Sequence, residues 1–274
     1  MAISDLGQTH KRGTASGYTS KLLKTGQTTQ YNDEPDDGYY EKGVAKSYTV
    51  NTTGDQSGTT NVDLAHYISV AGAISFNNTT KKITDSGSGL AIFKTNDVIL
   101  TSSANNPGPF TVTTGNVAGE IICSGATFVD ETPEEAITIY KRQAISNNTV
   151  LDNNTGLEWT RYQETKFGAV SNGLLPWTGK LYDIFAYCAA ANSVLLGGHN
   201  DWRIPNFPEL YSLANPARPD LTAFPSVNTN QYTWSSTSQA SDANRALVVH
   251  FGTGYGVYDT KSNNLACPFL VRGG

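Results

Sequence analysis

The sequence has few charged residues, few cysteines and no long apolar runs. Only 16% of its 274 residues are charged, and the formal net charge is −5. A small excess of carboxylates gives no basic footprint, so we expect no nucleic-acid partner. No apolar run approaches the roughly 20 residues that a membrane-spanning helix needs, so we expect no membrane insertion.

Residues suited to catalysis or metal binding are also scarce. The three cysteines, Cys123, Cys188 and Cys267, lack metal-site spacing and are too few for a disulfide framework. Two interpretations stay open: three buried thiols, or one Cys188–Cys267 bridge. None of the four histidines lies in a Ser/His/Asp or metal-ligand context, so we predict no catalytic residue, metal or cofactor. The acidic loop at 32–38 lacks the ligand spacing of a calcium loop and is interpreted as a solvated turn.

The N-terminal region is polar. Residues 1–21 carry a small basic patch at 10–12 and lack the apolar stretch of a secretory signal. We interpret them as an extended attachment arm, with a flexible tail as the alternative. The chain is then expected to be made in the cytoplasm of a host cell.

Glycine, serine, threonine and asparagine favour short strands and turns over long helices. Residues 46–144 predict a separate small all-β domain, a sandwich or a barrel, with turn signals every 10 to 15 residues or so. Short apolar strands are predicted at 68–70, 91–93, 98–100, 110–112, 121–123 and 137–139.

Residues 145–274 predict two helices that meet at a turn, 197–206. The first spans about 179–196 behind a Thr178 cap, and Gly197 and Gly198 end it. The second spans about 207–215, and Asn206 and Glu209 have the spacing of a capping box. The inward-facing residues are Leu181, Ile184, Cys188, Ala191 and Leu195 in the first helix, and Leu210 and Leu213 in the second.

Strands are predicted on either side of these helices. A strand, an Asn/Gly turn and a second strand span 149–159, and later strands lie near 232–236, 245–251, 256–259 and 269–272. Within 245–251, alternation places Ala246, Val248 and His250 on one face. That face is not very polar, which suggests that a partner covers it. Trp159, Trp202 and Trp234 are expected in the core.

Several ordered motifs in this region resemble the DUF1566 family, which includes the C-terminal domain of Legionella collagen-like adhesins. They are Thr155-Gly156-Leu157-Glu158-Trp159, Tyr187-Cys188, Asp201-Trp202-Arg203-Ile204-Pro205-Asn206, Glu209-Leu210, Phe224-Pro225, Trp234-Ser235-Ser236 and Val271-Arg272-Gly273-Gly274. The resemblance implies an α+β, C-type-lectin-like domain at 145–274 whose first and last strands pair. Residues 22–45 resemble the start of such proteins, so 46–144 would be inserted into the family's usual chain.

A second resemblance lies inside the inserted region. The turn Asp85-Ser86-Gly87-Ser88-Gly89 and the apolar segments that follow, up to Val112, look like a β module of bacteriophage virion proteins. The resemblance to the DUF1566 family implies binding rather than catalysis, with glycans or other cell-surface polymers as ligands. Sugar binding needs an aromatic face together with amide, carboxylate or guanidinium groups. The candidate ligand-binding residues are Tyr232, Asn244, Arg245, His250, Tyr255 and Tyr258.

Together these patterns predict a bacteriophage virion protein: a decoration, collar, tail-fibre or baseplate component that displays an adhesion domain. Its partners would be other virion proteins, reached through the arm, and further copies of itself. A bacterial surface adhesin is the alternative. A polysaccharide-cleaving enzyme with an acidic pair such as Asp220 and Asp259 is a third hypothesis.

Overall fold

The computed structural model describes residues 45–115, 117–163, 174–178, 183–214, 222–263, 265–266 and 268–273. The predicted arm, the acidic loop and all but the last residue of the lead segment lie outside the described residues. Every element below belongs to one compact unit, residues 46–274.

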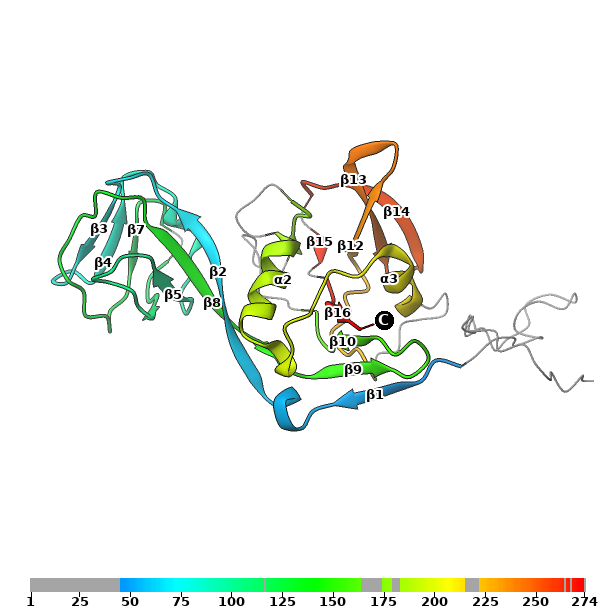
Figure 1. Cartoon of the computed structure of the whole chain (residues 1–274). Helices are drawn as coiled ribbons and strands as arrows, with labels where there is room; N and C mark the ends of the chain where they lie inside the picture. The colour runs from blue at the N-terminus through cyan, green and yellow to red at the C-terminus, as the bar shows by residue number, and fades with distance from the viewer. Residues whose placement is uncertain are drawn as a thin grey trace, which may run out of the picture. The chain divides into compact units, whose positions relative to one another are not determined.

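The described part of the chain is mostly β-sheet (Figure 1). It contains sixteen strands and only two α-helices, α2 (Ile184–Ser193) and α3 (Phe207–Leu213). The expectation of an α+β, C-type-lectin-like domain is therefore wrong. The predicted apolar stripe is buried at Ile184, Cys188 and Ala191 but ends before Leu195, which has a left-handed backbone (φ 53°) and is 56% exposed.

Two sheets enclose one apolar core in the inserted region. The first has the order β2-β8-β5-β6 and the second the order β3-β4-β7. Their bounds are Thr59–Ile68 (β2), Ile74–Asn77 (β3), Lys82–Asp85 (β4), Val98–Thr101 (β5), Phe110–Thr111 (β6), Glu120–Ile122 (β7) and Thr138–Ser146 (β8). The strand expected at 91–93 is wrong, because Leu90–Ile92 forms a 3-10 helix, η2.

The turn after β4 is built around a buried carboxylate. Asp85 accepts hydrogen bonds from the backbone N–H groups of Gly87 and Gly89 and from the Tyr67 hydroxyl at 2.5 Å. Burial and the Asp85 hydrogen bond raise the pKa of Tyr67 to about 12. Gly89 is required here because a Cβ would lie 2.1 Å from the Tyr67 ring.

Two further sheets form the C-terminal domain (Figure 1). The first has the order β1-β9-β10-β16 and the second the order β11-β15-β12-β13-β14. The bounds are Tyr48–Asn51 (β1), Thr149–Asp152 (β9), Glu158–Thr160 (β10), Leu174–Leu175 (β11), Tyr232–Gln239 (β12), Asp242–His250 (β13), Tyr255–Thr260 (β14), Leu265–Ala266 (β15) and Val271–Arg272 (β16).

The pairing of these strands ties the domain together across long sequence separations. Trp159 in β10, the second strand of the predicted domain, lies opposite Val271 in its last strand, β16. The first strand of that domain, β9, pairs with β1 and β10 instead. Strand β1 pairs with β9 although it lies within the range 46–144 assigned to the inserted region. The inserted region begins after β1, with Thr59 opposite Ser146 at the base of the β2–β8 ribbon.

Strand β13 lies between two apolar cores of the same chain. Ala246 and Val248 are buried against Trp234 and helix α2, while Val249 and Phe251 are buried in a second cluster with Trp159 and α3. The apolar face of 245–251 is therefore covered by this chain itself. The expectation that a partner covers it is wrong.

The tryptophan predictions are confirmed. Trp159, Trp202 and Trp234 are at most 3% exposed. Cys123 and Cys188 are free, buried thiols, and burial raises their pKa values to about 12 and about 11. Cys188 donates to the Trp202 carbonyl at 3.2 Å, and Cys267 lies outside the described residues.

Candidate functional site

The turn between the two helices is fixed by side chains on both sides. Asp183 caps α2 by accepting from the N–H groups of Phe185 and Ala186, so the cap lies five residues after the predicted Thr178. Asn206 caps α3, and its capping box with Glu209 confirms the prediction. Gly197 and Gly198 both have positive φ, 60° and 86°, and follow the end of α2.

Besides the bond from Cys188, three hydrogen bonds to Asn192 and Leu196 hold Trp202 inside this turn. The side chain of Asn192 donates to the Trp202 carbonyl and accepts from the Trp202 N–H, both at 2.8 Å. The indole N–H of Trp202 donates to the Leu196 carbonyl at 2.8 Å. Asn192 thus replaces the backbone partners that Trp202 lacks in an irregular segment.

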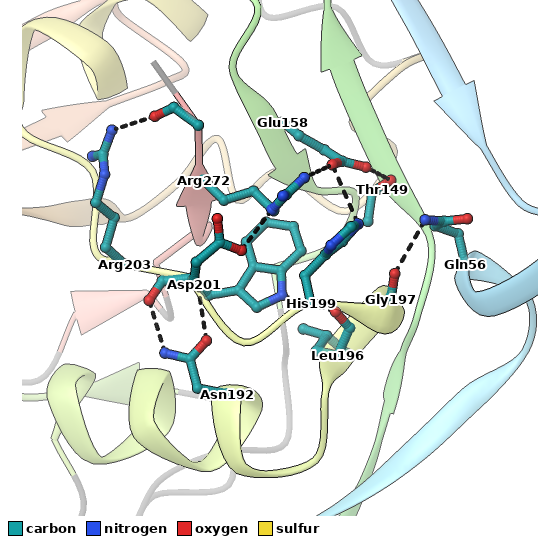
Figure 2. A network of polar contacts seen from close by, with 12 residues as sticks. Gln56, Thr149, Glu158, Asn192, Leu196, Gly197, His199, Asp201, Arg203 and Arg272 are labelled. Carbon is teal, nitrogen blue, oxygen red and sulfur yellow. Dashed lines mark hydrogen bonds and ion pairs between the residues drawn. The ribbon is translucent and has the colours of Figure 1, made fainter.

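Arg272 joins the turn to the last strand and to β10 (Figure 2). Its guanidinium donates to Glu158 at 2.6 Å and to Asp201 at 2.7 Å, and His199 lies 3.7 Å from Glu158. Burial alone would raise the pKa of Glu158. Hydrogen bonds from Thr149 and Arg272 and the nearby positive charges outweigh burial, so this pKa lies below its ordinary value.

A second ion pair braces the start of α3. Both terminal nitrogens of Arg203 donate to the Glu209 carboxylate at 2.7 Å. The acidic groups of this network, Glu158, Asp201 and Glu209, are all paired with arginine. The network therefore positions strands and helices, and its acidic and arginine side chains pair with one another.

Three of the six predicted ligand-binding residues lie side by side on one face of the second sheet. Tyr232 is opposite His250 in the β12–β13 ladder, and His250 is opposite Tyr255 in the β13–β14 ladder. The Tyr232 and His250 ring centroids are 4.9 Å apart. We name these three residues the aromatic row.

The outer end of the aromatic row is open to solvent. Tyr255 is 67% exposed. His250 is partly exposed, and its Nδ1 lies 3.0 Å from the Thr253 hydroxyl. The row thus presents an aromatic ring for stacking beside an imidazole and hydroxyls that can hydrogen-bond.

The other three candidates lie elsewhere. Arg245 and Tyr258 point to the opposite face, because they alternate with His250 and Tyr255 along their strands. Arg245 lies 3.5 Å from Asp242. Asn244 is exposed toward the far end of β13 from His250. The six predicted residues therefore do not form one site.

Sequence reasoning missed two surface features. The Lys261 ammonium lies 3.8 Å above the Trp177 ring, which packs edge-on against Phe185. No local pattern announces this contact, because Trp177 and Lys261 are 84 residues apart and meet only through folding. A cavity of about 440 Å³ is lined by Gly58, Thr59, Ala144, Ser146, Asn148, Tyr162, Gln163 and Ser226.

The acidic-pair hypothesis gains no support from the described residues. Among them, no group of three or more His, Cys, Asp or Glu side chains is arranged to hold a metal ion. Asp259 accepts from the Asn263 side chain at 2.7 Å, and Asp220 lies outside the described range. No helix in the described part is long and apolar enough to cross a membrane.

The C-terminal domain matches a known family. Residues 148–272 match the family model of the Lcl C-terminal domain, which supports the family resemblance drawn from the sequence motifs. The matched segment contains the turn network, the aromatic row and all strands from β9 to β16. The match suggests a bacterial surface adhesin-like family for this domain. No curated protein and no solved structure matches the chain.

Proposed function

We propose that residues 148–272 form an adhesion domain that binds a surface carbohydrate through the aromatic row. The observation that carries the proposal is the alignment of Tyr232, His250 and Tyr255 across three hydrogen-bonded strands, with Tyr255 67% exposed. A row on a sheet is rigid, so little ordering is needed when a ligand stacks on it. The match to the Lcl C-terminal domain supports adhesion as the class of function.

The finer proposal is that the chain is a bacteriophage virion accessory protein, assembled in the host cytoplasm. It is supported by the resemblance of residues 83–112 to virion β modules. In this arrangement the N-terminal arm binds other virion proteins and the C-terminal domain meets the host surface. The match at 148–272 favours a second candidate, a bacterial surface adhesin.

We propose binding rather than catalysis for this domain. Its main charged network, around Glu158, Asp201 and Arg272, is closed by ion pairs between its own members. The aromatic row offers stacking and hydrogen bonding, which are the interactions of sugar recognition.

The binding proposal is tested with Tyr255→Ala. The variant should lose about 1–2 kcal/mol of stacking, or about five- to thirtyfold in affinity, against a panel of purified bacterial surface polysaccharides measured by calorimetry. Tyr211→Ala is the matched control, because Tyr211 is an exposed tyrosine (41%) on α3 outside the row. Equal affinity of Tyr255→Ala and the wild type for every polysaccharide that the wild type binds would refute the site.

The location is tested separately. Mass spectrometry of purified tailed particles from the source lysate should detect the chain at a fixed copy number per particle. Detection on cell surfaces with none in particles would replace the virion proposal by the bacterial adhesin.

A further inference from the structure

Strand β14 is an edge strand of the sheet β11-β15-β12-β13-β14, and its outer edge is suited to pairing with another strand. In the described part of the chain, no strand pairs with that edge. Three large apolar or aromatic residues of this six-residue strand are exposed: Tyr255 (67%), Val257 (40%) and Tyr258 (48%). The strand contains no lysine or proline, and its ladder with β13 runs through six pairs without a bulge. Lysine, proline and β-bulges are means by which natural edge strands avoid pairing with another chain, and β14 has none of the three.

The hydrogen-bond pattern shows which backbone groups face outward. The Lys261 N–H donates to the Asn244 carbonyl, which makes this a hydrogen-bonded pair in the β13–β14 register. Hydrogen-bonded pairs alternate with non-bonded pairs in an antiparallel ladder. The backbone groups of Gly256, Tyr258 and Thr260 therefore point away from β13. The Thr260 N–H already donates to the Asp259 side chain at 2.7 Å. Gly256 and Tyr258 can therefore each offer an outward N–H donor and an outward carbonyl acceptor to another strand.

We propose that two copies of this chain pair through β14, antiparallel about a two-fold axis at Val257. Gly256 of each copy then lies opposite Tyr258 of the other, and each such pair exchanges two hydrogen bonds. This register uses the two outward-facing residues whose N–H groups remain available. A register centred on Tyr258 instead would need the Thr260 N–H that Asp259 occupies.

The side chains agree with this register on both faces of the sheet. On one face, Val257 meets its own counterpart, and Asp259 meets Tyr255, so no like charges are opposed. On the other face, Tyr258 of one copy lies opposite Gly256 of the other. The Phe207 ring occupies the space above Gly256, where a Cβ would lie 2.4 Å from its Cζ. The Tyr258 ring of the other copy would therefore pack beside this Phe207 ring.

The pairing also arranges the proposed binding sites. Directly opposed residues share a face of a sheet, so the two aromatic rows lie on the same side of one continuous ten-stranded sheet. Two sites on one face can engage a polymer together, which raises the effective affinity without new contacts. This consequence rests on the proposed carbohydrate function, whereas the pairing itself does not.

The test of the pairing is independent of any ligand. In sedimentation velocity, the full chain should be a dimer at about 100 µM and dissociate on dilution toward about 1 µM, because five residue pairs make a small interface. Val257→Lys places two ammonium groups at the axis and should abolish the dimer. Val70→Lys, at a 70% exposed position outside the C-terminal domain, should leave it intact. A wild-type monomer at 100 µM, or a dimeric Val257→Lys, overturns the proposal.

Cysteine substitution tests the register. Non-bonded opposed residues have Cα atoms about 4.5 Å apart, within the range of a disulfide. Val257→Cys should therefore form a reducible dimer under mild oxidation, while Tyr258→Cys, two residues out of register, should not. Faster cross-linking of Tyr258→Cys overturns the proposed register. A wild-type chain that dimerises but binds no polysaccharide would count against the aromatic row alone.

Discussion

Replacing Asn192 by alanine should destabilise the C-terminal domain by about 2–4 kcal/mol. The variant loses both hydrogen bonds to Trp202, each with a net value of about 1 kcal/mol. It also leaves the N–H of a 3%-exposed residue without a partner, and an unsatisfied buried group costs about 1–3 kcal/mol, whereas the Trp202 carbonyl keeps the Cys188 thiol as a donor. A domain of this size should then melt about 5–15 °C lower.

Tryptophan fluorescence during urea unfolding is the appropriate assay. All four tryptophans of the chain, at positions 159, 177, 202 and 234, lie within residues 148–272, so the signal reports this domain and not the inserted one. Ser193→Ala is the control, because Ser193 is exposed on the same helix and bonds only its own helix at Ala190. If Asn192→Ala unfolds within about 0.5 kcal/mol of the wild type, the side-chain bridge does not hold the turn.

The remaining predictions concern acid stability and the inserted region. The folded-state pKa of Glu158 is depressed, so its contribution is full above its unfolded pKa and is lost as pH falls through the folded value. Fluorescence-monitored unfolding from pH 7 to pH 3 should show this loss, and Glu158→Gln should reduce it; an unchanged slope would contradict the role of Arg272. Gly89→Ala should destabilise the inserted region by about 1–3 kcal/mol, because the new Cβ meets the Tyr67 ring, and calorimetry should show this as a lower melting temperature. Gly125→Ala, with open space around its Cα, is the control, and equal melting of the two variants would refute the steric argument.

Local features of the fold could be predicted from the sequence. The capping box at Asn206 involves residues three apart, so its spacing is visible in the chain. The hairpin of β9 and β10 is also local, because a short turn joins two apolar segments. The start of α2 was misplaced, since Asp183 is a second capping residue five positions after Thr178 and the sequence alone does not rank the two.

Features that depend on distant residues could not be predicted. Arg272 binds Glu158 across 114 positions and Asp201 across 71. The burial of both faces of β13 was missed because each face is covered by a different core, one with α2 and one with α3. The fold class was wrong because two short helices gave strong local signals, while the many strands are short and gain their stability only from pairing with distant segments.

The β2–β8 ribbon is a point at which the inserted region could be replaced by another domain. The first residue of β2, Thr59, lies opposite the last residue of β8, Ser146. The chain therefore leaves the C-terminal domain and returns to it at one place. The first residues of the ribbon belong to the core of that domain, through Val62, Leu64 and Ile145. A lineage could therefore replace everything past the first residues of the ribbon with an unrelated module while the C-terminal domain keeps its packing. Diversification of such a protein would be concentrated beyond Leu64, where the domain's own stability no longer depends on the sequence.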